Sequence, residues 1–560
     1  MLMPKYRVAR IDTFLGASTD RSGVELLKNE FTTLTNIQNN NLKGLSKRPG
    51  ATKVFDQTHA GSATKARGVF TYTVAGVETY IKIDDQGKVY KSTGSTWTQI
   101  TASAPTFANA DAYMASMNTK DTGAANTDSG TAEAGTSNDI KDHDKNLTVG
   151  AYIDQALTVN GEIKLISGNS PTTIFVKERF DTTPSTETYT VNPRAVEFFI
   201  ANGTNFYKCD GTTFTRLDNS NFAFAFTGIE THVGRLFGWK GTRLHWSDVG
   251  IGEHYSRDSF KDFSSDIQRV KSFGDVLVVY EREKVSVLRG SNPDAAEIEE
   301  VLDIGTTAPK SVANYHGQYQ FFLNEEFGVI IFSKSDLKSE GRGEPVSISD
   351  SYYNDDILAQ SSASIQAAPG EVHKEHYHLC IDDDWYKLNV RASENTGFKH
   401  WVWMKDDRPA THDANVLGHF GTRLVSGPQD TGQIFHIENT AATSDDSAAI
   451  ARTMEKKDWN PTGRRDNKHY ARIKISQATT AATATMNYFA DPEGSTYGSA
   501  MKSINLKTAG TSEHDVPFTA NASDVKNIGK KISIKITESG TVAVSDIEEI
   551  SMLYLPGIET

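Results

Sequence analysis

The sequence lacks several features that would place it in a common class. It has only two cysteines in 560 residues, Cys209 and Cys380, so a fold built on disulfides is excluded. No stretch approaches the roughly 20 apolar residues that a membrane-spanning helix needs. The N-terminus also lacks the apolar run of a signal peptide. We therefore expect a protein that is assembled in the cytoplasm and makes no membrane contact.

Sequence patterns of helices and of enzymes are scarce too. Apolar residues rarely recur at a helical period, and residues 355–364 are the best candidate for a short helix. The chain contains no Gly-x-Ser-x-Gly, no Walker loop and no dinucleotide-binding glycine motif after a strand. Residues 90–97 (YKSTGSTW) resemble a sialidase Asp box, but Ser92 replaces its defining aspartate. No spacing identifies the carboxylate pair of a glycosidase. We expect no enzymatic activity and no cofactor.

Positive charge is in deficit. The chain carries 58 Lys and Arg against 71 Asp and Glu, a formal net charge of −13. A protein that grips nucleic acid by neutralising phosphates has the opposite balance. An acidic surface would instead let DNA slide past without adhering.

What the chain does contain is a recurring phrase of two short apolar runs joined by a tight polar turn, the pattern of a β-hairpin. The phrase begins eight times, at residues 76, 150, 194, 234, 274, 317, 375 and 421. The starts at 234, 274 and 317 are separated by 40 and 43 residues, the length of one four-stranded propeller blade. We predict an all-β fold, a β-propeller with six to seven blades.

Composition divides the chain into segments. We expect an N-terminal segment over 1–60 and a propeller over 61–440, interrupted by a loop-rich insertion at about 105–190. Within the insertion, 101–137 is so poor in large apolar side chains that it is expected to be a loop or an exposed extension. A polar linker follows at 441–468. Residues 469–560 alternate apolar and polar side chains, which predicts a C-terminal antiparallel β-sandwich.

Two groups of residues could bind a metal ion. His376, His378 and Cys380 alternate along one predicted strand and so share a face, but no second cluster completes a zinc site. The simpler interpretation is a blade strand with partly exposed imidazoles and a buried Cys380. The run from Asp142 to Asn146 (DHDKN) has the alternating oxygens of a calcium loop, without its glycine or its final glutamate. We predict no metal site.

Two basic clusters are candidate contacts for phosphate or for an acidic partner. They comprise Lys43, Lys47, Arg48 and Lys53 around a Pro-Gly turn, and Arg464 and Arg465 before the terminal sheet. Each cluster could equally be a solvated turn or a place where a neighbouring subunit docks.

Several phrases together resemble one family. The first phrase is KRPGATKVF, which begins at Lys47. It is followed by ETHVGRLFGWKGTRLHWSDVG, VKSFGDVLVVYEREKVSVLRGSNP and APKSVANYHGQYQFFLNEEFGVIIFS. In their order along the chain and in their hairpin pattern, these phrases resemble the tail nozzle proteins of short-tailed bacteriophages, also called tail tubular protein B or packaged-DNA stabilisation proteins. The likeness covers roughly residues 30–440 and extends to the terminal sheet.

The resemblance implies a structural virion protein in the phage tail that is assembled in the host cytoplasm. Such a protein forms a ring, usually of six copies, below the portal and adaptor proteins. It supports tail fibres or spikes and helps to retain packaged DNA. Double-stranded DNA passes through the ring without specific binding. The resemblance implies no covalent chemistry.

Two other functions remain open. A propeller face could bind or depolymerise carbohydrate on a virion. A cellular propeller scaffold is the third alternative, although the Trp-Asp-like phrase at 245–248 occurs only once.

Overall fold

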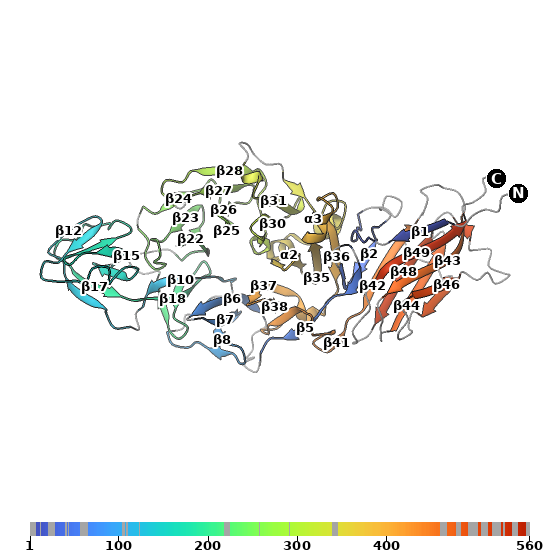
Figure 1. The fold of residues 1–560 in the computed structure, drawn as a ribbon, viewed down its shortest axis with the longest axis horizontal. Helices are drawn as coiled ribbons and strands as arrows, with labels where there is room; N and C mark the ends of the chain where they lie inside the picture. The colour runs from blue at the N-terminus through green and yellow to red at the C-terminus, as the bar shows by residue number, and fades with distance from the viewer. Residues whose placement is uncertain are drawn as a thin grey trace.

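The computed structural model describes residues 7–555. Its longer gaps are 21–28, 56–64, 104–109 in part, 218–224, 339–344, 460–467, 478–482, 491–501, 506–512, 518–527 and 540–546, and a few single residues or pairs are also left out. The molecule is elongated and has three parts (Figure 1). A β-propeller forms the middle, a small β-domain lies at one end, and a larger β-domain containing both described ends of the chain lies at the other.

The propeller consists of seven β-sheets whose innermost strands follow one another around a common hub. This confirms the predicted fold class and gives the upper of the two expected blade numbers. In chain order, from the hub outward, the blades are β6 (Ala66–Val74), β7 (Val77–Asp84), β8 (Val89–Ser92) and β9 (Thr98–Gln99); β10 (Tyr113–Lys120), β18 (Arg194–Ala201), β19 (Phe206–Cys209) and β20 (Phe214–Arg216); β21 (Gly228–His232), β22 (Arg235–Lys240), β23 (Arg243–Trp246) and β24 (Phe260–Asp262); β25 (Arg269–Phe273), β26 (Val276–Tyr280), β27 (Val285–Arg289) and β28 (Ile298–Leu302); β29 (Ala313–Tyr315), β30 (Tyr319–Asn324), β31 (Gly328–Ser333) and β32 (Val346–Ser347); β33 (Gly370–His373), β34 (His376–Ile381), β35 (Asp384–Asn389) and β36 (Val402–Asp406); and β37 (Ala414–Phe420), β38 (Arg423–Pro428), β39 (Phe435–Asn439) and β5 (Gly50–Lys53).

All eight predicted hairpins are present. Seven of them supply the two middle strands of the seven blades, and the eighth lies in the insertion. The glycine that opens several of the phrases lies in the turn before the hairpin, between the innermost strand and its neighbour. Gly234 (φ 70°) and Gly317 (φ 64°) have the left-handed backbone that such tight turns require.

The N-terminal segment closes the ring. In the last blade, β37, β38 and β39 come from the C-terminal side of the propeller, whereas the outer strand β5 comes from the N-terminal side. β5 runs antiparallel to β39, with His436 opposite Thr52. A Cβ atom at Gly50 would lie 2.2 Å from the carbonyl oxygen of Ser444, which explains the glycine of the Pro-Gly turn. The expected separate segment over 1–60 is therefore divided between the propeller and the terminal domain.

The insertion starts later than predicted. It occupies 121–193, between β10 and β18 of the second blade. It is a seven-stranded β-domain with its own apolar core, formed by β11 (Asp128–Thr131), β12 (Ala134–Thr136), β13 (Asp139–Lys141), β14 (Ala156–Val159), β15 (Glu162–Asn169), β16 (Thr173–Val176) and β17 (Thr188–Asn192). The expectation of a loop over 101–137 was wrong, because this stretch holds β10, β11 and β12. β10 packs small side chains such as Ala115, and Ala132, between β11 and β12, is also buried.

The terminal domain has two sheets around a shared apolar core, as the predicted sandwich requires. Its described strands are β1 (Arg7–Ile11), β2 (Thr33–Thr35), β3 (Ile37–Asn39), β4 (Leu45–Lys47), β42 (Arg452–Trp459), β43 (Lys468–Gln477), β44 (Thr483–Ala490), β45 (Lys502–Asn505), β46 (Glu513–Pro517), β47 (Ile528–Gly529), β48 (Ile532–Ser539) and β49 (Ile547–Leu555). β2 pairs with both β36 and β42, so the sheet of the sixth blade continues into this domain.

The polar stretch 441–468 is not simply a linker. It contributes the eight-residue strand β42 and the short strands β40 (Ser444–Asp445) and β41 (Ala448–Ala449), which extend the sheet of the last blade. The few described helices are short: α1 (Asn354–Leu358), α2 (Ser362–Ala367), α3 (Val390–Asn395), η1 (Pro309–Ser311), η2 (Asp336–Lys338) and η3 (Ala410–His412). None of them is long and apolar enough to cross a membrane.

The insertion can be tested as a separable unit. Lys120 lies opposite Arg194 in the blade, and the amide of Asp121 donates a hydrogen bond of 2.9 Å to the carbonyl of Pro193. Because the two ends are already adjacent, replacing 122–192 by Asn-Gly should leave a folded monomeric propeller by circular dichroism and size-exclusion chromatography. Deleting 105–137 instead removes β10 and should give insoluble protein. Aggregation of the first variant would contradict the assignment.

Candidate functional site

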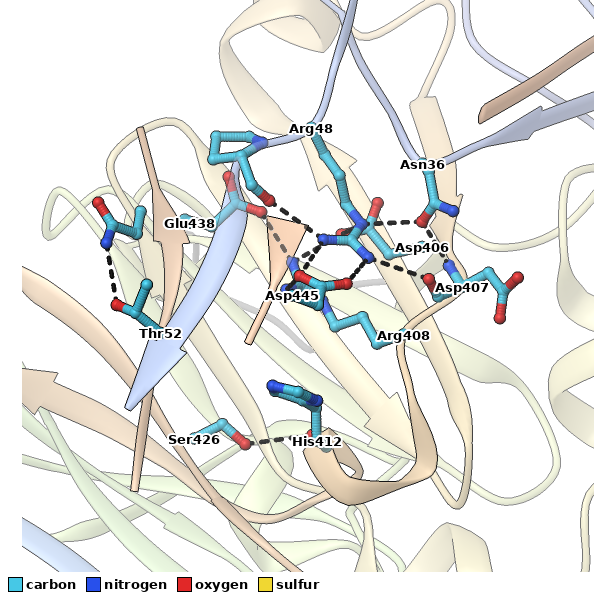
Figure 2. A network of polar contacts seen from close by, with 12 residues as sticks. Asn36, Arg48, Thr52, Asp406, Asp407, Arg408, His412, Ser426, Glu438 and Asp445 are labelled. Carbon is cyan, nitrogen blue, oxygen red and sulfur yellow. Dashed lines mark hydrogen bonds and ion pairs between the residues drawn. The ribbon is translucent and has the colours of Figure 1, made fainter. Parts of the chain in front are cut away.

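The N-terminal strand is held in the ring by one buried arginine. Arg48, just before β5, donates hydrogen bonds through Nη1 to Asp445 Oδ1 (2.9 Å), through Nε to Asn36 Oδ1 (2.8 Å) and through Nη2 to the carbonyl of Asp407 (3.0 Å). Its Nη2 also pairs with Asp445 Oδ2, and its Nε lies 3.8 Å from Asp406 Oδ2. The guanidinium thus joins the last two blades to the terminal domain (Figure 2).

Around Arg48 lies a closed set of six charges, which we call the closure network. Its cations are Arg48, Lys387 and Arg408, and its anions are Asp406, Glu438 and Asp445. Arg408 lies 3.0 Å from Asp406 and 3.2 Å from Glu438, and Lys387 lies 3.5 Å from Glu438. All six side chains are buried. Three positive and three negative charges cancel, which is the condition under which so many ions can be buried.

The pKa values of the network agree with this pairing. Burial opposes the charged form of Asp445, but hydrogen bonds from Arg48 outweigh it and hold the pKa of that carboxyl below its usual value. Burial likewise works to lower the pKa of Arg48, and Asp445 and Asp406 hold it above its usual value instead. The pKa of Glu438 is lowered by Lys387 against its own burial. Arg48, Glu438 and Asp445 therefore keep their charges through their partners.

The structure gives different roles to the described residues of the first basic cluster predicted from the sequence. Arg48, which that prediction included, is 2% exposed and fully committed to the closure network. Lys53 pairs with Asp446 at 3.0 Å on the surface. Lys47 is half-buried at the end of β4. Lys43, Arg464 and Arg465 lie outside the described residues.

The histidine strand is buried rather than partly exposed. His376, His378 and Cys380 share one face of β34, as predicted, and all three are enclosed between the last two blades. Burial, aided by Lys387, lowers the pKa of His376 to about 3, so the imidazole is neutral. Within the described part of the chain these three side chains belong to no group at metal-ligand distances.

The remaining sequence candidates have structural roles. Asp142 accepts hydrogen bonds from the hydroxyl of Tyr189 (2.9 Å) and the amide of Asp144 (3.1 Å), which fixes a turn in the insertion. Trp97, at the end of the Asp-box-like phrase, is buried between blades, with its ring 5.8 Å from that of Phe420. The phrase is a turn anchored by one aromatic side chain.

A polar cavity of about 420 Å³ lies at the hub. Residues from all seven innermost strands or the residues flanking them line it, which identifies it as the axial space of the propeller. No local sequence pattern indicated this cavity, because its lining residues come from seven strands spread over about 350 residues.

Charges in the hub are mostly paired. The cavity is lined by four cations, Arg67, Arg269, Lys271 and Lys310, and three carboxylates, Asp111, Glu230 and Glu371. Asp111 lies 3.3 Å from Arg67 and 3.1 Å from Lys310, and Glu230 lies 3.8 Å from Arg269. Asp111 and Glu230 are thus both held by ion pairs with cations of the hub.

Comparisons with known proteins identify no family. No family model and no curated protein matches the chain. Among solved structures, it is similar to the computationally designed Ika8 protein (TM-score 0.33, 10% identity, covering 69% of this chain and 98% of that chain). It is also similar to BBS1N in complex with ARL6DN (0.38, 10%, 70% and 99%) and to YCF48 bound to D1 peptide (0.36, 6%, 70% and 97%).

Removing Arg48 should open the closure network. Arg48→Ala leaves Asp445 buried without its main partner and removes one cation from beside Asp406, a change that typically costs about 3–5 kcal/mol. We expect a loss of that size in the free energy of unfolding, measured by urea titration. Lys53→Ala, five residues away in a surface pair with Asp446, is the matched control and should cost less than about 1 kcal/mol. Equal effects of the two variants would contradict the role given to Arg48.

The buried histidines predict loss of stability in acid. Burial is the main cause that lowers the pKa of five histidines to about 3 or 4: His245, His373, His376, His412 and His436. An unfolded histidine has a pKa of about 6.5. Below that pH these histidines are protonated in the unfolded chain but remain neutral in the folded chain. Their contribution to the free energy of unfolding is therefore complete above pH 6.5 and falls as the pH drops towards 4.

One carboxyl acts in the opposite direction. Burial, with the neighbouring Asp383, raises the pKa of Asp413 to about 7. As the pH falls, this carboxyl is protonated in the folded chain before it is in the unfolded chain, and the stability gained offsets the loss caused by about one histidine. The urea midpoint should therefore fall between pH 6.5 and 4.5, and His436→Gln should flatten that fall. The exposed His143→Gln should not change it. A midpoint independent of pH would refute the prediction.

Proposed function

We propose that the protein is a structural subunit of a phage tail nozzle, a ring around the passage through which DNA leaves the virion. The proposal starts from the sequence resemblance and includes its partners: further copies of this chain, in a ring of six, together with adaptor or portal proteins and tail fibres or spikes. It assigns the chain to the virion tail and gives it no enzymatic activity.

The observation that carries the proposal is a closed propeller with one β-domain at each of two opposite ends (Figure 1). The closure network and the strand β5 make the middle a rigid block. The end domains give such a block separate surfaces for a ring neighbour and for an adjacent ring. Rigid subunits with fixed contact surfaces are what a closed symmetric ring requires.

The dimensions of the hub support a passage between copies rather than through one. A cavity of 420 Å³ is on the order of 7–8 Å across, narrower than the roughly 12 Å major groove of B-DNA alone. A duplex therefore cannot run through the hub. In the proposed ring, the channel is the space enclosed by several propellers.

A second function is favoured by the same cavity. Its volume falls within the range of about 300–1,000 Å³ typical of small-molecule sites. A saccharide could bind to its polar lining, as in a carbohydrate-binding virion protein. The paired carboxylates Asp111 and Glu230 argue for binding over cleavage.

Electron cryo-microscopy of the purified protein, alone and mixed with its candidate adaptor, tests the proposal. We expect rings of six copies with an axial channel wide enough for duplex DNA. Incubation with host surface polysaccharide, followed by size analysis of the polymer, should leave its length unchanged. A monomer at every concentration tested, or a shortened polymer, would reject the nozzle.

A further inference from the structure

One of the places where the insertion contacts the propeller is the connection between β23 and β24 of the third blade. Lys120 of β10 and Arg235 of β22 also contact the insertion. Lys164 of β15 is buried and pairs with Asp248 at 2.9 Å. Nearby, Leu165 packs against Ile251, and Nη1 of Arg194 donates to the carbonyl of Gly250 at 3.1 Å. The contact is therefore partly apolar and partly ionic, and residues on its two sides have fixed positions.

Three potential metal ligands meet at the edge of this contact. Glu162 begins β15, Asp181 follows β16 in the insertion, and His254 lies in the connection between β23 and β24 of the propeller. One ligand atom from each lies within 4.8 Å of the other two. Among the described residues this is the one group of three such side chains at that spacing. Atoms that bind one ion at about 2 Å lie within about 4 Å of one another, so this spacing is close to that of a metal site.

The imidazole is held as it is in metal sites. Nδ1 of His254 lies 2.6 Å from Oδ2 of Asp248, which leaves Nε2 as the nitrogen available to an ion. A histidine whose second nitrogen is bound to a carboxylate is the usual arrangement around zinc. Asp248 is held in turn by Lys164, so the chain supplies both the ligand and its support.

The carboxylates are positioned from the backbone. Glu162 accepts hydrogen bonds from the amides of Asp181 (2.8 Å) and Thr182 (3.0 Å), and Asp181 Oδ1 accepts one from the hydroxyl of Ser256 (2.6 Å). Each carboxylate oxygen has two lone pairs, so these contacts leave capacity for a cation.

The charge around the group favours a divalent cation. Four carboxylates lie in this contact, those of Glu162, Glu178, Asp181 and Asp248, against the cations Lys164 and Arg235. Counting Arg194, which also lies in this contact, the seven charged side chains sum to −1, an excess of negative charge that a cation would offset. Lys164 lies 3.6 Å from Glu162 but 2.9 Å from Asp248. It therefore holds Asp248, which in turn holds His254, and it does not take the place of the ion.

We propose that Glu162, Asp181 and His254 form a site for a divalent transition-metal ion, preferentially zinc, that ties the insertion to the propeller. Mixed nitrogen and oxygen ligands suit zinc better than calcium or magnesium, which take oxygen alone. Water would occupy the remaining coordination position, because Asp181 is exposed. The ion would stiffen the joint between the two bodies.

Isothermal titration of chelator-treated full-length protein with zinc chloride at pH 7.5 tests the site. We expect one zinc ion per chain, with binding weakened at least tenfold by His254→Ala and by Asp181→Asn. The second variant changes an exposed side chain and should fold normally. His143→Ala is the matched control: His143 pairs with Glu133 at 2.6 Å in the same domain without a third ligand.

Hydrogen exchange provides a readout at the joint itself. Zinc should slow amide exchange in 247–256 and 178–182 of the native chain and leave the Asp181→Asn variant unchanged. Equal zinc affinity in the native chain and both site variants would overturn the proposal. So would tighter binding of calcium or magnesium than of zinc.

Discussion

The burial of Arg48 is the constraint on which the rest of the architecture depends. A propeller must join its last blade to its first, and here the joining strand arrives from the other end of the chain. A balanced group of buried ions adds little net stability compared with apolar residues of the same size. What it adds is selectivity, because a strand without an arginine at this position would leave Asp445 buried without its main partner. The network therefore specifies β5 as the closing strand.

The same residues couple closure of the ring to the terminal domain. Asn36 lies between β2 and β3 and accepts hydrogen bonds from both Arg48 and the amide of Asp407. β2 extends the sheet of the sixth blade, so backbone pairing and side-chain pairing meet at one place. A displacement of the terminal domain would disturb the closure network, and the two parts should therefore move together. At the opposite end, the insertion has its own core and a smaller contact.

Local patterns predicted the hairpins, and distant partners explain what was missed. Each hairpin carries both of its strands and its turn within about 17 residues, so the sequence contains the whole signal. β5 has four residues and pairs with β39 almost 400 residues away. β10 buries small side chains such as Ala115, which a search for large apolar residues overlooks. Arg48 was predicted as a surface contact for a related reason. The sequence of a basic turn does not show whether its arginine is exposed to solvent or is paired with carboxylates from distant parts of the chain.

The distribution of charge links the structure to the proposed passage. The closure network sums to zero, and the hub carries four cations against three carboxylates. Neither interior space therefore accounts for the net charge of −13, which must come from the rest of the molecule. In the proposed ring, an acidic surface that faces a duplex would repel its phosphates, so the ring would enclose DNA without binding it.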